Sequence, residues 1–134
     1  MGLDSRVVLI TGGASGIGGE CARQFIAQGA RVVLADIDAA RGEALACDLG
    51  DAAEFQWLDV TSESGWQRLA GDLAGRYGRL DVLVNAAGIV LNADIEDTSL
   101  EDFRRVHAVN VEGVFLGCRV AIALMKARGG VIVN

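Results

Sequence analysis

The sequence of 134 residues has no proline, and Lys126, Tyr77 and His107 are its only lysine, tyrosine and histidine. Turns must therefore rely on its 18 glycines. A formal net charge of −6, with no cluster of basic residues, argues against a nucleic-acid partner. We find no apolar run as long as a membrane span and no signal peptide. We therefore expect a cytoplasmic protein that binds neither nucleic acid nor membrane.

The three cysteines give no sign of a metal site or a disulfide. Cys21, Cys47 and Cys118 are far apart and form no Cys-x-x-Cys motif. An odd number of cysteines without the spacing of metal ligands indicates reduced thiols. Each lies among small apolar residues in a stretch of helical spacing, so we expect all three to serve packing. No metal site is predicted.

Two kinds of apolar pattern alternate along the chain. Short β-branched runs predict strands, and longer stretches of helical spacing lie between them. Thr98–Glu101 matches a capping box at the start of the last and longest helix. Alternating strands and helices predict βαβ units, hence an α/β fold with a doubly wound parallel sheet in one domain. The nearly continuous apolar strands indicate that helices cover both faces. Strands are expected at 6–11, 31–35, 54–60, 80–85 and 130–134, and the longest helix at 100–127.

A glycine-rich loop joins the first predicted strand to the first predicted helix. Glycines in this position allow a tight turn, let the backbone approach a pyrophosphate and let the helix pack closely on the strand. The helix N-terminus then presents free N–H groups and a partial positive charge to phosphates. Between a buried strand and an amphipathic helix, this loop predicts dinucleotide binding. The residues expected to contact the cofactor are Gly12, Ser15, Gly16, Ile17 and Gly18.

Asp36 ends the second predicted strand, where a carboxylate can accept hydrogen bonds from the adenosine ribose. A helix N-cap is the other role for an aspartate here, and that role suits Asp38 better. A 2′-phosphate beside Asp36 would meet like-charge repulsion of ~1–4 kcal/mol at close range. Ser15 and Ile37 supply no nearby cation to relieve it. NAD is therefore expected in preference to NADP, with Ile37 also at the site.

The spacing Thr-Gly-x-x-x-Gly-x-Gly from Thr11 to Gly18 resembles that of the short-chain dehydrogenase/reductase family, and the resemblance extends over all 134 residues. It implies a Rossmann sheet with strand order 3-2-1-4-5. Asp59 and Val60, taken to end the third strand, resemble the family's adenine-contacting pair. The segment from Asn85 through Ala86 to Gly88 resembles its Asn-Asn-Ala-Gly motif, with alanine in place of the second asparagine. The family's cofactor contacts there are largely backbone, so this departure changes little.

Asn110 matches the family's active-site asparagine, which implies that it positions a water molecule in a proton relay. A satisfied core amide is the other interpretation of Asn110. Members of the family run to roughly 250 residues as one domain. They carry a catalytic serine after the fifth strand and a Tyr-x-x-x-Lys motif on the next helix. The sequence contains no such motif, since Tyr77 is followed four residues later by Asp81. We expect an N-terminal cofactor-binding portion, truncated after the fifth strand, that does not turn over alcohols alone.

Tyr77 and Lys126 are both predicted at the C-terminal ends of helices, on the wrong side of the sheet to replace the missing pair. His107 has no carboxylate or thiol partner nearby in sequence and is expected to be a partly exposed helix residue. The run Gly88–Leu91 and the segments 114–126 and 129–130 resemble bacterial hydroxysteroid and cyclic-alcohol dehydrogenases. The substrate implied is a small alcohol or ketone.

Three functions remain open. The first is an NAD-dependent oxidoreductase of secondary alcohols and ketones, present as its cofactor-binding half. The second is a non-catalytic protein that binds or senses NAD(H). The third, an interaction module without nucleotide, is disfavoured by the intact glycines and Asp36, while Asn110 favours the first. An apolar strand at 131–133 on the sheet edge and the long helix, which packs between subunits in the family, predict a homo-oligomer.

Overall fold

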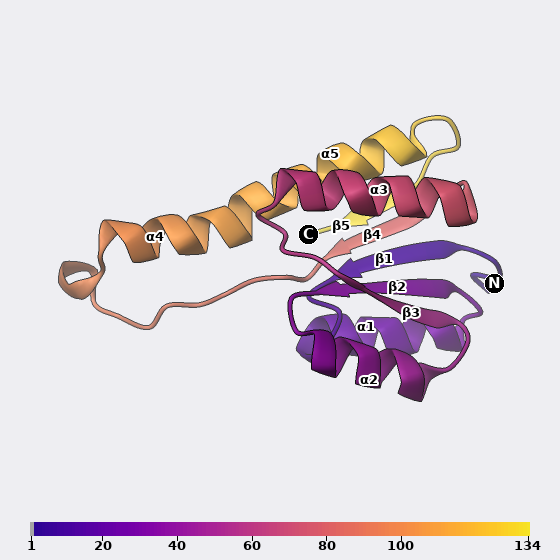
Figure 1. Ribbon diagram of the computed structural model, residues 1–134, viewed down its shortest axis with the longest axis horizontal. Helices are drawn as coiled ribbons and strands as arrows, with labels where there is room; N and C mark the ends of the chain where they lie inside the picture. Colours follow the sequence, from indigo (N-terminus) through magenta and orange to yellow (C-terminus); the bar gives the residue numbers. More distant parts are fainter. Residues whose placement is uncertain (1) are drawn as a thin grey trace.

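The computed structural model describes residues 2–134, with a five-stranded parallel sheet at its centre (Figure 1). The strand order is β3-β2-β1-β4-β5, and every neighbouring pair is parallel. The predicted Rossmann fold and its strand order are confirmed. The strands are β1 (Val7–Thr11), β2 (Arg31–Asp36), β3 (Ala53–Trp57), β4 (Val82–Asn85) and β5 (Val131–Val133).

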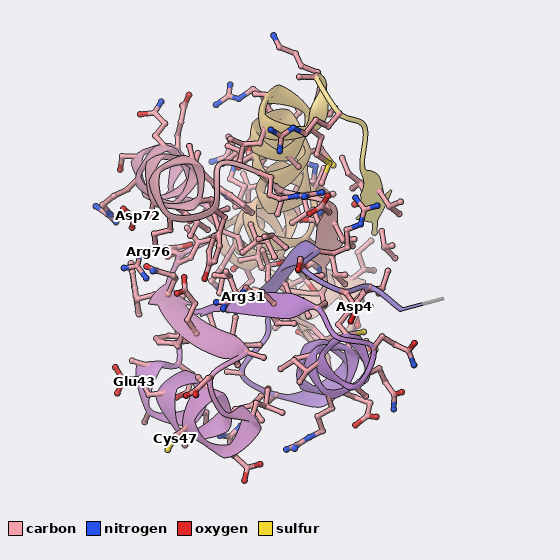
Figure 2. All side chains as sticks on the ribbon, turned by 90° about the vertical axis from the view of Figure 1, so that its right-hand side faces the viewer. Asp4, Arg31, Glu43, Cys47, Asp72 and Arg76 are labelled. Atoms are coloured by element: carbon pink, nitrogen blue, oxygen red, sulfur yellow. The ribbon has the colours of Figure 1, made fainter. Side chains whose placement is uncertain are left out.

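Helices cover both faces of the sheet (Figures 1 and 2). Alternation along β1 explains how one strand serves two cores, because successive side chains point to opposite faces. Val8 and Ile10 pack in one cluster with residues of the first two helices, whereas Val7 and Leu9 pack in another with Trp66 and residues near the C-terminus. The helices of the first face are α1 (Gly16–Ala27) and α2 (Ala39–Leu49), and those of the second are α3 (Glu63–Tyr77) and α5 (Gly113–Met125).

Side-chain caps fix where two of these helices begin. The Asp38 carboxylate accepts a hydrogen bond from the Arg41 N–H at 3.0 Å, so Asp38 caps α2 as its position in the sequence suggested. Ser62 caps α3 in the same way through the Gly65 N–H, also at 3.0 Å. Ser15 precedes α1, but its hydroxyl makes no capping bond. The first turn of α1 is therefore left with its N–H groups unpaired by a side chain.

The predicted capping box at Thr98–Glu101 is wrong by one residue. Helix α4 (Leu100–His107) begins after Ser99, whose hydroxyl accepts the Asp102 N–H at 3.0 Å and bonds to the Asp102 carboxylate at 2.9 Å. Thr98 instead donates to the Asp94 carbonyl at 2.9 Å, closing the short 3₁₀ helix η1 (Ile95–Asp97). Both patterns overlap in the sequence, so spacing alone could not choose between them.

The long helix predicted at 100–127 is divided in the structure. Between α4 and α5 lies a π-helical turn, η2 (Ala108–Glu112), in which the Gly113 N–H bonds to the Ala108 carbonyl five residues earlier. Gly113 is where the helix meets the rest of the fold, since an added Cβ would lie 2.8 Å from Val60 Cγ2. The widened turn therefore directly precedes the point where the helix meets the loop after β3.

The third strand is shorter than the predicted 54–60. It ends at Trp57, and Asp59 and Val60 lie in the loop that follows, so the prediction that they end the strand is wrong. The Asp59 carboxylate accepts the Thr61 N–H at 2.9 Å, which turns the chain away from the sheet. The Val60 carbonyl accepts the Trp66 indole N–H at 2.9 Å. These local bonds take the place of the inter-strand backbone hydrogen bonds that a longer strand would have made.

Two further expectations meet different outcomes. β5 lies at the sheet edge as predicted, with Val131 57% and Val133 48% exposed. The expectation that no segment is as long and apolar as a membrane span is wrong for Leu100–Met125. By length and composition alone this helix could cross a membrane, since an 18-residue window within it has a mean hydropathy of 1.6. Core helices of soluble proteins can meet the same test, although little of this segment is buried in the chain.

The cysteines are free thiols in helices, as predicted, but they do not all serve packing. Cys21 and Cys118 are half-buried, whereas Cys47 is exposed on the outer side of α2 (Figure 2). The packing role expected of Cys47 is therefore wrong. The Ala-rich stretch around it is a helix with little buried surface of its own, since Gly42 is its one buried residue.

Candidate cofactor-binding site

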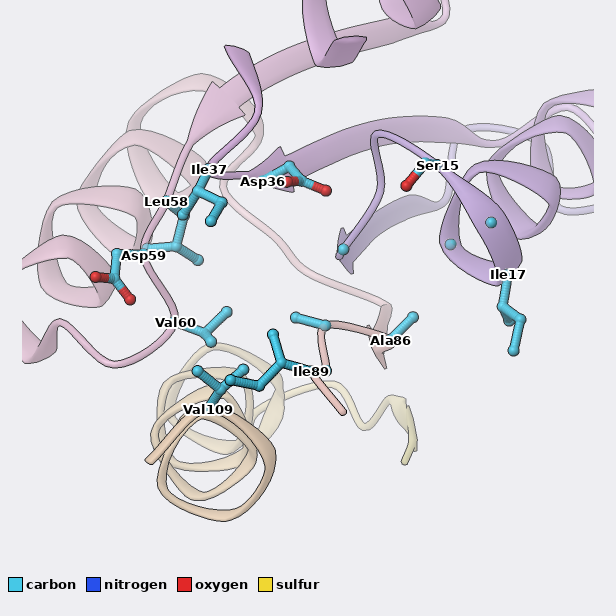
Figure 3. Close-up of a pocket in the computed structure, with 15 residues that line it drawn as sticks. Ser15, Ile17, Asp36, Ile37, Leu58, Asp59, Val60, Ala86, Ile89 and Val109 are labelled. Atoms are coloured by element: carbon cyan, nitrogen blue, oxygen red, sulfur yellow. The ribbon is translucent and has the colours of Figure 1, made fainter. Parts of the chain in front are cut away.

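A cleft of about 380 Å³ opens at the carboxyl ends of the strands (Figure 3). β1 has β2 on one side and β4 on the other, so the connections leaving this region run to opposite halves of the sheet. Ligands of doubly wound folds bind at such a switch point. The cleft is lined by Gly12, Ser15, Gly16, Ile17, Gly18, Asp36, Ile37, Leu58, Asp59, Val60, Ala86, Ala87, Gly88, Ile89 and Val109.

The glycine-rich loop folds back on itself at the floor of the cleft. Gly12 has a φ of 63°, and an added Cβ would lie 2.8 Å from the backbone of Ala86. At Gly18 an added Cβ would lie 2.3 Å from the Gly12 carbonyl oxygen. A side chain at either position would push the start of α1 away from the strand ends, so glycine is required here by close approach.

The start of α1 is suited to bind an anion. Its first turn carries no acidic side chain, and the Ser15 hydroxyl is not used as a cap. An added Cβ at Gly16 would have no heavy atom within 4 Å, so the backbone there borders open space. Free N–H groups and the positive end of the helix dipole therefore face the cleft without a competing internal acceptor.

Asp36 occupies the neighbouring strand end, and Figure 3 shows its carboxylate turned toward Ser15. One carboxylate oxygen accepts the Ala14 N–H at 3.1 Å, and the other accepts the Asp38 N–H at 3.0 Å. Each oxygen keeps further acceptor capacity, which a pair of ribose hydroxyls could use. None of the residues that line the cleft is lysine, arginine or histidine.

The wall opposite the glycine-rich loop is formed by Leu58, Asp59 and Val60. Trp66 holds this wall in place from behind, since its buried indole donates to the Val60 carbonyl. The close contact between Gly113 and Val60 presses α5 against the same segment. The wall is therefore fixed by two helices, although it belongs to neither helix nor strand.

The loop after β4 closes the remaining side. The Thr11 hydroxyl, 1% exposed, accepts the Ala87 N–H at 3.2 Å and ties this loop to β1. Asn110, in the π-helical turn, donates its amide to the Ile89 carbonyl and accepts the Ile89 N–H, both at 2.9 Å. Asn110 is thus exposed and not a buried core amide. Its side chain bonds to both backbone groups of Ile89 and so joins the π-helical turn to the loop after β4.

The structure brings together all but one of the residues predicted to contact a cofactor. Asn85 does not line the cleft. Its side-chain amide donates to Asn134 at 2.7 Å and lies 3.7 Å from the Cys118 sulfur, so it links β4, the segment after β5 and α5. Four lining residues were missed by sequence reasoning, although each directly follows or precedes a residue that was chosen: Leu58, Ala87, Ile89 and Val109.

The residues that could have replaced the missing catalytic pair lie elsewhere. Tyr77 ends α3 and Lys126 follows α5. Both lie where the strands begin, at the end of the sheet opposite the cleft. Burial and the nearby Glu54 carboxylate raise the pKa of Tyr77, the reverse of what a general base requires. His107 is exposed and stacks on Phe103, with 6.1 Å between ring centroids. Among residues 2–134 no group of three potential metal ligands converges.

Comparison with known proteins agrees with this geometry. The family model described as short chain dehydrogenase matches residues 6–134. The chain is 46% identical over 132 residues to a 3-beta-hydroxysteroid dehydrogenase of Comamonas testosteroni, covering 98% of this chain and 52% of that protein. It is 40% identical over 138 residues to a trans-4-hydroxycyclohexanecarboxylate dehydrogenase of Sinomonas cyclohexanicum, covering 96% and 53%.

Among solved structures, the crystal structure of gox2181 matches with a TM-score of 0.94 and 32% sequence identity, covering 98% of this chain and 53% of that one. The chain thus spans about half the length of the curated relatives it matches. The hydroxysteroid and cyclic-alcohol dehydrogenases that its sequence resembles are among these relatives. Motif spacing, strand order and these matches agree, and the chain belongs to the short-chain dehydrogenase/reductase family.

Proposed function

We propose that this chain is the cofactor-binding half of an NAD-dependent oxidoreductase that interconverts secondary alcohols and ketones. The observation that carries the proposal is the cleft at the strand ends, where a glycine-rich turn, a free helix N-terminus and Asp36 converge. The residues proposed to hold NAD are those that line this cleft, with Asn85 supporting them through β4. NAD would supply the hydride acceptor there.

The preference for NAD over NADP rests on charge. Asp36 faces the position expected of the adenosine ribose, and the lining residues include no cation to neutralise a 2′-phosphate. Repulsion between that phosphate and the carboxylate should favour NAD by ~1–4 kcal/mol.

Asn110 is proposed as a catalytic-site residue with two parts to its role. Its side chain holds Ile89 at the cleft, and the widened helical turn around it disturbs the regular pairing of backbone groups, which suits a water molecule in a proton relay. The sequence holds no Tyr-x-x-x-Lys motif, and Tyr77 lies at the far edge of the sheet. Alone, this chain should therefore bind cofactor without oxidising alcohols.

The same cleft suits a second candidate function. A non-catalytic protein that binds or senses NAD(H) needs only this cofactor site. For an enzyme, the names of the relatives point to hydroxylated steroids and cyclic alcohols as the substrate class. We also propose a cytoplasmic location and a homo-oligomer, formed through the apolar side chains that the α4–α5 helix exposes: Phe103, Val111, Phe115 and Ile122.

Titration of the purified chain with NADH and NADPH, by calorimetry, tests the cofactor proposal. NADH should bind, and Asp36→Asn should tighten NADPH binding roughly tenfold by removing the repelling charge. Asp72→Asn, on the exposed surface of α3, is the matched control and should change neither affinity. The proposal fails if the chain binds neither nucleotide, or if it prefers NADPH.

Alcohol oxidation, followed as NADH formation, separates the two candidate functions. Binding without turnover is the outcome expected of the chain by itself. Turnover by the purified 134-residue chain would show that another residue replaces the tyrosine and would exclude the sensor.

A further inference from the structure

The chain has two tryptophans, and each donates its indole N–H to the backbone carbonyl of a residue that lines the cleft. Trp66 donates to Val60 at 2.9 Å, and Trp57 donates to Ile37 at 3.1 Å. Neither indole lines the cleft itself. Packing accounts for Trp66, which is 1% exposed in the core. It does not account for Trp57, which is 53% exposed at the end of an edge strand.

Trp57 lies where β2 and β3 separate. It is the last residue of β3 and the register partner of Asp36. The Leu58 N–H bonds to the Asp36 carbonyl at 3.0 Å and forms the final backbone rung between the strands. The indole N–H then supplies one more bond, to the next carbonyl along, that of Ile37. Trp57 thus extends the pairing of the two strands by one residue into the rim of the cleft.

This extra bond acts on the segment that is proposed to recognise the adenosine ribose. The Asp36 carboxylate already accepts N–H groups from Ala14 on one side and Asp38 on the other. Those bonds fix the Asp36 carboxylate but do not involve the Ile37 carbonyl, which accepts the Trp57 indole N–H. Ile37 is 64% exposed at the cleft, so few apolar contacts hold it. Its position therefore depends strongly on the bond from the indole.

We propose that Trp57 is a positioning residue for cofactor selection: it holds the Asp36–Ile37 segment in the place where a ribose hydroxyl is accepted and a 2′-phosphate is excluded. This inference rests on the proposed function of the cleft. A rigid rim is what discrimination requires, because a segment free to move could withdraw its carboxylate from a phosphate. Without the indole N–H, the rim should tolerate both dinucleotides more equally.

Trp57→Phe removes the N–H donor and keeps an aromatic ring at the edge of the sheet. Calorimetry should show that the dissociation constant of NADH rises roughly three- to tenfold, as expected for the loss of one hydrogen bond. The dissociation constant of NADPH should stay within about twofold, because the lost bond also relaxes the excluding carboxylate. Tyr77→Phe, beside Glu54 near the start of β3 and away from the cleft, removes one polar hydrogen from an aromatic side chain and should change neither value.

Amide hydrogen exchange in the absence of nucleotide supplies a second readout. In Trp57→Phe the amides of residues 37–39 should exchange faster, while those in the middle of β2 keep the rate of the unmodified chain. Unchanged exchange at residues 37–39 overturns the positioning role. So does an equal loss of affinity for NADH and NADPH, which would indicate general damage to the site.

The outcomes also separate this inference from the proposed function. If the unmodified chain binds neither dinucleotide, the proposed function is wrong and cofactor selection by Trp57 falls with it. If the unmodified chain prefers NADH and Trp57→Phe keeps the same preference, only the role of Trp57 is wrong.

Discussion

The contacts of a single added carbon atom determine where the chain can accept a side chain in place of glycine. A methyl group at Gly18 would lie within 2.3 Å of the Gly12 carbonyl oxygen, whereas at Gly71, in the middle of α3, it would meet nothing within 4 Å. The fold therefore requires glycine at position 18 but not at position 71. Gly18 permits a contact, while Gly71 leaves an exposed helix with needless backbone freedom.

Alanine at these two positions should therefore act in opposite directions. Gly18→Ala should weaken NADH binding more than roughly tenfold and lower the melting temperature, because the loop must shift to relieve the clash. Gly71→Ala should stabilise the protein by ~0.5–1 kcal/mol and leave NADH binding unchanged. Thermal unfolding of both variants measures the change in stability, and calorimetric titration measures the change in NADH affinity. Equal tolerance of the two substitutions would contradict the close approach described for Gly18.

The two tryptophans also differ at this scale. Trp57 is 53% exposed and Trp66 is 1% exposed. Acrylamide should therefore quench the fluorescence of Trp57 strongly and that of Trp66 hardly at all. Trp57→Phe should leave an emission that is blue-shifted and nearly insensitive to quencher. A remaining emission that is easily quenched would show that the segment around Trp66 opens in solution.

At the scale of the elements, β1 and β4 are joined at their starts by one carboxylate. Asp81, just before β4, accepts the Val7 N–H at 2.9 Å, the Arg6 guanidinium at 3.0 Å and the Arg79 Nε at 2.8 Å. Burial by itself raises the pKa of Asp81, but the bonds from Arg79, Val7 and Arg6 together hold that pKa below its ordinary value. The ionised form is therefore the one that the fold stabilises.

The pH dependence follows from this direction. Because folding lowers the pKa of Asp81, its contribution is fully present above the ordinary value near ~4 and is lost as the pH falls through the lower, folded value. Asp81→Asn should lower the free energy of unfolding at pH 7 by about 1–3 kcal/mol. Urea unfolding should show this difference shrinking below pH ~4. A difference that stays constant to pH 2 would contradict the assignment to the charged carboxylate.

Elements also show what could be predicted from sequence and what could not. The alternating patterns predicted a parallel α/β sheet and the loop at Thr11–Gly18 predicted the cleft, both from local features, whereas the strand order was implied only by the resemblance to the family. The end of β3 could not be predicted, because the indole of Trp66, from the following helix, takes the Val60 carbonyl. The π-helical turn was hidden for the same reason: its sequence is apolar and helical, and the contact of Gly113 with Val60 is tertiary.

Asn110 likewise combines a feature that the sequence predicted with one that it did not. Its position on the long helix was clear from the sequence, but its two bonds to Ile89 were not. Ile89 lies 21 residues earlier, in a loop with no regular pattern. Likewise, nothing in the sequence indicates that Asn85 turns toward Cys118 and Asn134 rather than into the cleft. Spacing predicts which residues reach the carboxyl edge of the sheet, while side-chain direction depends on neighbours from other elements.

On the scale of the whole molecule, the helix from α4 to α5 exposes a row of large apolar side chains. Phe103 is 57%, Phe115 59% and Ile122 56% exposed. α4 has no buried residue, and Figure 1 shows it extending beyond the sheet. Such a surface is stable in water mainly when a second surface covers it.

Phe115→Glu should therefore weaken self-association roughly tenfold or more, since it replaces buried apolar surface with a charge. Sedimentation velocity over a range of concentrations would measure the shift toward monomer. Gln67→Glu, on the exposed side of α3, adds the same charge elsewhere and should leave the association unchanged. A chain that sediments as a monomer at every concentration would contradict the proposed homo-oligomer.

The strand order has a consequence for how the molecule is made. β1, β2 and β3 are neighbours in both sequence and space, so they can pair while the later chain is still being synthesised. The other edge of β1 must wait for β4, whose partner residues lie about 74 positions later, as in the pair Val8 and Val82. The loop that closes the cleft follows β4, and Asn110, which holds it, comes later still. A nascent chain would therefore carry the glycine-rich loop without stabilisation by nucleotide until Asn110 has been synthesised, and β1 has one open edge until β4 pairs with it.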